Sequence, residues 1–179
     1  ELPKGIQDMA FPSSGLFIIT GETDSGKSTT LGSIIRHWAV RPNAVRIITY
    51  EDPVEHDFRA IPNTTACISQ TSVGVGEMMQ DWGACIPNAV RRNPDIIMLG
   101  EISTPESMKN AISAARAGHV VYTTLHAGSV ALAFSRIINE FPENEQSMAR
   151  EALITTVRGV VHQSLLTMKD GMKRIAVYE

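Results

Sequence analysis

The eight residues Gly21-Glu-Thr-Asp-Ser-Gly-Lys-Ser28 fit the pattern G-x-x-x-x-G-K-[ST] of a phosphate-binding loop. Glycines at these positions let backbone N–H groups turn towards phosphate oxygens. Lys27 has the length to reach the β- and γ-phosphates of a nucleotide, and the Ser28 hydroxyl can ligate Mg²⁺. The spacing therefore predicts a nucleotide site formed by Gly21, Glu22, Thr23, Asp24, Ser25, Gly26, Lys27, Ser28 and Thr29.

Two carboxylates inside this loop, Glu22 and Asp24, are unusual beside a polyphosphate. If they pointed into the site, their negative charge would repel the nucleotide. If they pointed away from it, they would have no effect on nucleotide binding. Aspartate tolerates the turn conformations that glycine otherwise supplies. We expect both side chains to point outward.

Further acidic residues directly follow two apolar runs. Glu51 opens the segment Glu-Asp-Pro-Val-Glu after residues 46–50, and Glu101 follows residues 95–99. A nucleotide hydrolase needs one carboxylate to orient the attacking water and another to hold Mg²⁺, directly or through water. Glu51 and Glu101 are the candidates, and the sequence does not decide which is the base. Asp95 precedes its run, so we expect a structural role for it at the opposite end of the sheet.

Two histidines bracket a fourth apolar run, residues 119–125. If the run is a strand, His126 lies at its carboxyl end, where an imidazole can sense the γ-phosphate. His126 is therefore the third catalytic candidate. His119 lies at the amino end, and the simpler interpretation is a polar residue with its hydrogen bonds satisfied. The spacing of the histidines does not favour a zinc site.

The elements that position these residues alternate between strands and helices. The apolar runs are short and do not alternate with polar residues, as is typical of strands buried in a parallel sheet. We expect an α/β fold, a mainly parallel twisted sheet with helices on both faces and with ligands at the carboxyl ends of the strands. The expected strands are 16–20, 46–50, 66–70 (the weakest), 95–99 and 119–125; the expected helices are 27–39, 76–92, 105–117, 130–139 and 143–166; residues 1–14 are expected to form a loop.

Composition narrows the class of protein. The 179 residues suit one domain, and 43% of them are hydrophobic, which excludes intrinsic disorder. The 16 Lys and Arg against 19 Asp and Glu give a net charge of −3, so direct nucleic-acid binding is not expected. No apolar run is long enough for a membrane span, and no signal peptide is recognisable. We expect Cys67 and Cys85 to be reduced and half-buried, although their spacing would permit a disulfide.

Four segments occur in an order that resembles the bacterial type II/type IV secretion ATPase superfamily. They are the phosphate loop, Thr49-Tyr-Glu-Asp-Pro-Val-Glu55, Asn93-Pro-Asp-Ile-Ile-Met-Leu-Gly-Glu101 and Ala117-Gly-His-Val-Val-Tyr-Thr-Thr-Leu-His126. They correspond to the family's Walker A, Asp box, Walker B and His box. The resemblance covers about residues 15–166 and lies nearest to the conjugation and Dot/Icm-like branch.

The resemblance implies a RecA-like carboxyl-terminal ATPase domain that spans residues 1–179 of a longer protein. Members form hexameric rings at the cytoplasmic face of the inner membrane and use ATP and Mg²⁺ to drive pilus dynamics, secretion or conjugation. By position, Lys27 and Ser28 would bind phosphate and Mg²⁺, Glu51 and Glu101 would position Mg²⁺ and water, and His126 would sense the γ-phosphate. His119 matches the family's other histidine, which makes it a further candidate.

Three features depart from the family pattern. Glu22 and Asp24 replace the usual Pro and Gly, and Ser103 and Thr104 stand where Arg and Asp follow the Walker B glutamate. The amino-terminal domain, which supplies arginines to the site in this family, is not part of the chain. Because of these departures, an alternative function remains open, in which the protein is a structural subunit that binds nucleotide but hydrolyses little of it. A small-molecule kinase is the other alternative, but the arginines do not cluster into a lid.

Overall fold

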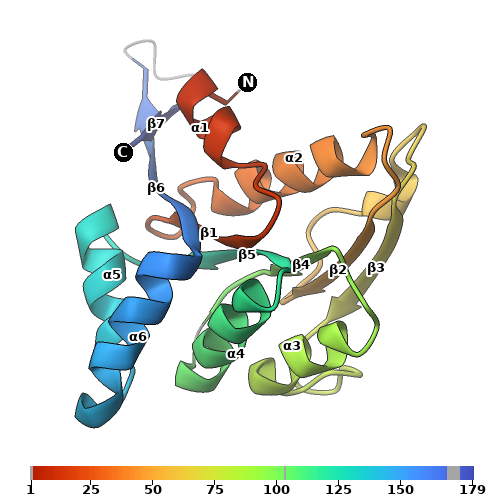
Figure 1. Cartoon of the computed structure of the whole chain (residues 1–179). Helices are drawn as coiled ribbons and strands as arrows, with labels where there is room; N and C mark the ends of the chain where they lie inside the picture. Colours follow the sequence, from red (N-terminus) through yellow and green to blue (C-terminus); the bar gives the residue numbers. More distant parts are fainter. Residues whose placement is uncertain (1, 103, 169–173) are drawn as a thin grey trace.

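A seven-stranded sheet forms the centre of the protein in the computed structural model, which describes residues 2–102, 104–168 and 174–179. Its strand order is β3-β2-β4-β5-β1-β6-β7 (Figure 1). Neighbouring strands are parallel except for β6 and β7, which pair antiparallel. The strands are β1 (Gly15–Thr20), β2 (Arg46–Glu51), β3 (Cys67–Ser72), β4 (Ile96–Leu99), β5 (Val120–Leu125), β6 (Val157–Thr167) and β7 (Arg174–Tyr178).

Helices cover both faces of this sheet, as predicted. One face carries α1 (Lys4–Met9) and α2 (Lys27–Ala39) (Figure 1). The other face carries α3 (Trp82–Val90), α4 (Pro105–Arg116), α5 (Val130–Asn139) and α6 (Glu143–Thr156). A short 3₁₀ helix, η1 (Phe58–Ala60), follows β2 in the chain. Among the described residues, none of these helices combines the length and the apolar character needed to cross a bilayer.

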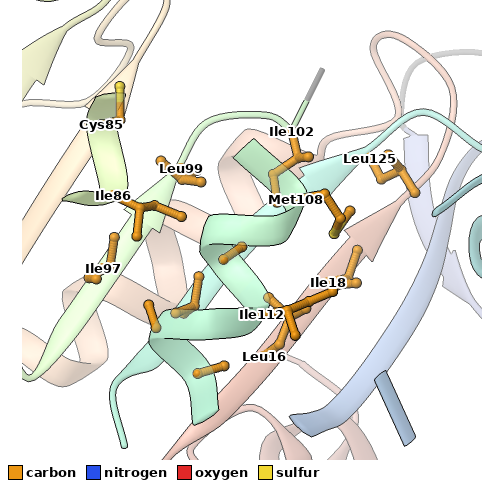
Figure 2. Close-up of a cluster of buried hydrophobic side chains, with 14 of the residues drawn as sticks. Leu16, Ile18, Cys85, Ile86, Ile97, Leu99, Ile102, Met108, Ile112 and Leu125 are labelled. Atoms are coloured by element: carbon orange, nitrogen blue, oxygen red, sulfur yellow. The ribbon is translucent and has the colours of Figure 1, made fainter. Parts of the chain in front are cut away.

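Two hydrophobic clusters join the helices to the sheet, because alternate residues of a strand face opposite sides. In β1, Leu16 and Ile18 belong to the cluster beneath α3–α6, whereas Phe17 and Ile19 belong to the cluster beneath α1 and α2. Figure 2 shows the first cluster, in which Met108 and Ile112 of α4 lie near Ile18 of β1. These central strands are buried on both faces, which explains why they read as continuous apolar runs.

The predicted helix over residues 143–166 is wrong in its second half. Helix α6 ends at Thr156, and the chain continues as strand β6 beside β1. Gly159 disfavours a helix, and a Cβ there would come within 2.7 Å of Phe17. Val157, Gly159 and Val161 also recur at the period of two that a strand needs, which is the signal that the prediction missed.

Two smaller expectations also fail. The helix predicted over 76–92 begins only at Trp82, because the Asp81 carboxylate accepts a hydrogen bond from Gly83 N–H and caps it. The segment 1–14, predicted to be a loop, contains α1, which buries Ile6 against the sheet. The weak run near residues 66–70 does form a strand, β3, at the sheet edge.

The two cysteines differ more than predicted. Both are free, so the disulfide alternative is wrong, but neither is half-buried: Cys67 is exposed and Cys85 is buried. Burial raises the pKa of the Cys85 thiol to about 12, with a smaller contribution from Asp81.

Candidate functional site

The carboxyl ends of the central strands surround a cavity of about 520 Å³. The phosphate loop lines it from residue 23 to residue 29, Glu51 lines it from the end of β2, and Glu101 and His126 line it after β4 and β5. The structure therefore brings the predicted loop, both glutamates and the expected histidine around one space. Their chemical roles remain predictions.

The phosphate loop has the backbone conformation that a nest of N–H groups requires. Gly26 has φ +84° and Asp24 has φ 60°, both in the left-handed region. In the described part of the chain, no side chain caps the start of α2 after Gly26. The first N–H groups of α2 are thus available to an anion, and the helix dipole favours one there.

Lys27 lies inside this loop with its side chain folded back on the backbone. Its Nζ donates hydrogen bonds to the carbonyl oxygens of Gly21, at 3.0 Å, and Glu22, at 2.6 Å. Burial lowers the pKa of the Lys27 ammonium, while Glu101 and Asp24 partly oppose that shift. A phosphate group beside the ammonium would offset the desolvation, so the loop is suited to an anionic ligand.

Glu51 is a buried carboxylate held by its neighbours. Thr49 Oγ1 and Gln70 Nε2 donate hydrogen bonds to Glu51 Oε1, at 2.7 Å and 3.0 Å. Gln70 also donates to the carbonyl oxygen of His56 and accepts from Phe58 N–H, which ties it to the segment after β2. Two donors on one oxygen orient the carboxylate and leave Oε2 without a donor from the described residues.

Glu101 is more open and lies beside His126. Their closest approach is 3.8 Å, between Glu101 Oε2 and His126 Nε2, and both side chains are nearly half exposed. Thr124 Oγ1 donates to the Gly100 carbonyl at 2.6 Å, which holds the turn that carries Glu101. Arg136 in α5 donates to the His126 carbonyl. Hydrogen bonds therefore hold the backbone at Gly100 and His126, while the side chains of Glu101 and His126 remain exposed enough to contact a ligand.

The donors around the cavity suit Mg²⁺. Ser28, Glu51 and Glu101 supply hydroxyl and carboxylate oxygens, which are the ligands that this ion prefers. Within the described ranges, no group of three His, Cys, Asp or Glu side chains is placed to hold a metal by itself. In nucleotide sites Mg²⁺ commonly takes its other ligands from phosphate and water.

Three predicted residues lie differently from the rest. His119 is at the amino end of β5, where its Nδ1 is 2.8 Å from the Pro94 carbonyl oxygen, and it lines a separate cavity at that edge. Glu22 is exposed and outside the lining of the main cavity, as expected, whereas Asp24 lines it. Asp24 is exposed as well and has a φ of 60°, and the expectation that its carboxylate points outward stays a prediction.

The structure explains one of the two departures from the family pattern after Glu101. Thr104, where the family pattern has Asp, caps α4 by accepting a hydrogen bond from Ser107 N–H. Aspartate and threonine both serve as N-caps, so the substitution preserves the start of the helix. Ser103 lies outside the described residues.

Sequence reasoning missed three residues at this edge. His56, to which no role was given, lines the cavity after β2, and Arg174 lines it from β7. Gln163 in β6 binds the phosphate loop directly, with Nε2 donating to the Ser25 carbonyl at 2.6 Å. The misassigned helix hid Gln163, whereas the period of two in β6 would have directed it inward with Gly159 and Val161.

The fold and this site define a P-loop nucleotide-binding domain of the parallel α/β class. Residues 4–174 match the family described as type II/IV secretion system protein, and the chain belongs to that family. The family resemblance found in the sequence is thereby confirmed.

Known proteins that resemble the chain are secretion and pilus proteins. A twitching motility protein of Neisseria gonorrhoeae is 33% identical over the whole chain and 46% of its own length. The ATPase DotB of Legionella pneumophila has a TM-score of 0.94 and 34% identity, with 100% of this chain and 48% of that chain covered. The pilus retraction motor PilT, solved with bound ADP, has a TM-score of 0.89 and 34% identity, with 99% and 50% covered. The chain thus spans about half the length of the relatives it matches.

Proposed function

We propose that this chain is the ATP-hydrolysing motor domain of a secretion, conjugation or type IV pilus ATPase. The observation that carries the proposal is the cavity in which a phosphate loop, two glutamates and a histidine from the ends of four strands converge. The similarity of the chain to the ATPase DotB and to the motor PilT, which was solved with ADP, supports the same conclusion. Residues 1–179 would form the RecA-like carboxyl-terminal domain of that protein.

The residues divide the chemistry between them. The loop N–H groups and Lys27 bind the phosphates, and Ser28 with a glutamate would hold Mg²⁺, which supplies charge neutralisation at the β- and γ-phosphates. Glu51, with one oxygen fixed by Thr49 and Gln70, presents the other to the attacking water. His126 would contact the γ-phosphate, and Glu101, 3.8 Å from it, would hold Mg²⁺ or water. The geometry favours Glu51 as the base, because its carboxylate is buried and oriented.

Membership of the family supports a proposal about the assembly. We propose a homo-hexamer, peripheral at the inner face of the bacterial inner membrane, that acts on pilus or secretion machinery without direct nucleic-acid contact. In the hexamer, a neighbouring subunit would complete each site. Sedimentation of the full-length protein with and without nucleotide tests the hexamer.

The experiment that tests the activity is Mg-ATP hydrolysis by the full-length protein, with Lys27→Ala and Glu101→Gln measured in parallel. We expect turnover in the unmutated protein and its loss in both variants, because one loses phosphate binding and the other a carboxylate beside the γ-phosphate. Tight ATP binding without turnover in the unmutated protein would contradict the motor and favour a nucleotide-binding structural subunit.

A further inference from the structure

Gln163 joins strand β6 to the phosphate loop through both ends of its side-chain amide. Its Nε2 donates to the Ser25 carbonyl at 2.6 Å, and its Oε1 accepts from Thr30 Oγ1 at 2.7 Å. Gln163 is only 2% exposed, so neither bond competes with bulk water. One side chain therefore fixes the loop before Lys27 and helix α2 after it.

The contact is also sterically close. A Cβ on Gly26 would lie 2.8 Å from Gln163 Nε2 and would push this amide out of its place, and the φ of +84° at Gly26 also favours glycine there. Ser25, whose carbonyl Gln163 binds, has a buried hydroxyl without a hydrogen-bond partner among the described residues. This hydroxyl lies in the phosphate loop and is free to accept or donate a further hydrogen bond there.

We propose that Gln163 is a positioning residue that holds the phosphate loop in its phosphate-accepting conformation. It acts through the loop backbone and Thr30 and does not itself touch the nucleotide. Because β6 continues towards β7, whose Arg174 lines the same cavity, the amide also ties this strand pair to the loop. The inference rests on the proposed nucleotide site but not on hydrolysis.

A positioning role predicts a specific kinetic pattern. Without Gln163 the loop must order itself when ATP binds, and this ordering weakens binding without changing the groups that perform hydrolysis. In the full-length protein, we expect Gln163→Leu to raise the KM for ATP about tenfold while kcat stays within about twofold. Thr30→Val, which removes one bond at nearly constant shape, should raise KM about threefold.

Two further variants separate positioning from packing. Thr30→Ser keeps the hydroxyl and should restore a KM close to that of the unmutated protein. Gln163→Leu combined with Thr30→Val should be no worse than Gln163→Leu alone, since the two residues share one interaction. Thr156→Val is the matched control, because Thr156 is a buried threonine whose Oγ1 bonds to the Ala152 carbonyl, away from the loop.

Clear results would overturn the inference. An unchanged KM in both Gln163→Leu and Thr30→Val contradicts it, as does a Thr30→Ser variant that is as impaired as Thr30→Val. A KM rise in Thr156→Val equal to that in Thr30→Val would show general loosening of the fold instead. If the unmutated protein binds but does not hydrolyse ATP, the motor function fails, and the Kd of a fluorescent ATP analogue then tests Gln163 by the same comparisons.

Discussion

At the carboxyl edge of the sheet, Glu51 and His126 face a cavity, whereas at the amino edge Asp95 and His119 bond to the backbone. Asp95 Oδ2 accepts from Arg46 N–H at 2.7 Å, and the His119 ring meets the Pro94 carbonyl oxygen. Each edge thus holds a carboxylate and an imidazole beside a cavity. The difference is that only the cavity at the carboxyl edge is also lined by the phosphate loop, so only there can these groups act on a bound phosphate.

The largest effect is expected when the carboxylates of the two edges, Glu51 and Asp95, are substituted in turn. Glu51→Gln should lower kcat for Mg-ATP by about 100-fold or more, because an amide cannot act as the base, while ATP binding persists. Asp95→Asn is the matched control and should keep kcat within about twofold, since an amide oxygen can still accept from Arg46 N–H. Steady-state hydrolysis and ATP titration measure both. Equal losses in the two variants would show that the edges are not functionally distinct.

The histidines offer the next comparison. His126→Ala should lower kcat about tenfold by removing a contact to the γ-phosphate. His119→Ala should leave kcat unchanged but destabilise the fold by about 1 kcal/mol, or about 3 °C in Tm, through the lost bond to Pro94. Hydrolysis assays and thermal melts of the full-length protein separate the two. A kcat loss in His119→Ala would instead support the role that the family resemblance suggested for it.

The smallest expected effect concerns the two acidic residues of the loop. Asp24→Asn removes a charge that lines the cavity and should strengthen ATP binding about threefold, because the repulsion is screened by solvent. Glu22→Gln removes a charge outside the lining and should leave the affinity unchanged. Nucleotide titration at two salt concentrations measures both. An unchanged affinity in Asp24→Asn would sink the idea that this carboxylate weakens the site.

Much of the fold could be predicted because its central strands are buried on both faces. Runs such as Leu16–Ile19 need no knowledge of their neighbours to be recognised as strands of a parallel sheet. Strand β6 was missed because its apolar residues do not alternate regularly with polar ones: Val160 and Val161 are adjacent, and Arg158 and His162 flank them, a mixed pattern that also suits a helix. The helix predicted from residue 76 failed because its true start depends on the cap at Asp81.

The candidate site divides in the same way. The loop and the residues after β2, β4 and β5 could be predicted, because parallel strands end at one edge whatever their order. The burial and the hydrogen-bond partners of each side chain could not be predicted. Glu51 is buried and accepts a hydrogen bond from Gln70 on β3, whereas Glu101 is nearly half exposed beside His126.

Features that depend on neighbours along the chain could be read from the sequence alone. The turn at Gly26, the start of α2 and the burial of the central strands follow from glycine's conformational freedom and from apolar patterning. The meeting of distant groups at this edge depends on the tertiary structure instead: Gln163 bonds to Ser25, and Arg174 lines the cavity. Such contacts depend on sheet order and strand register, which arise from packing across the whole domain and have no local signature.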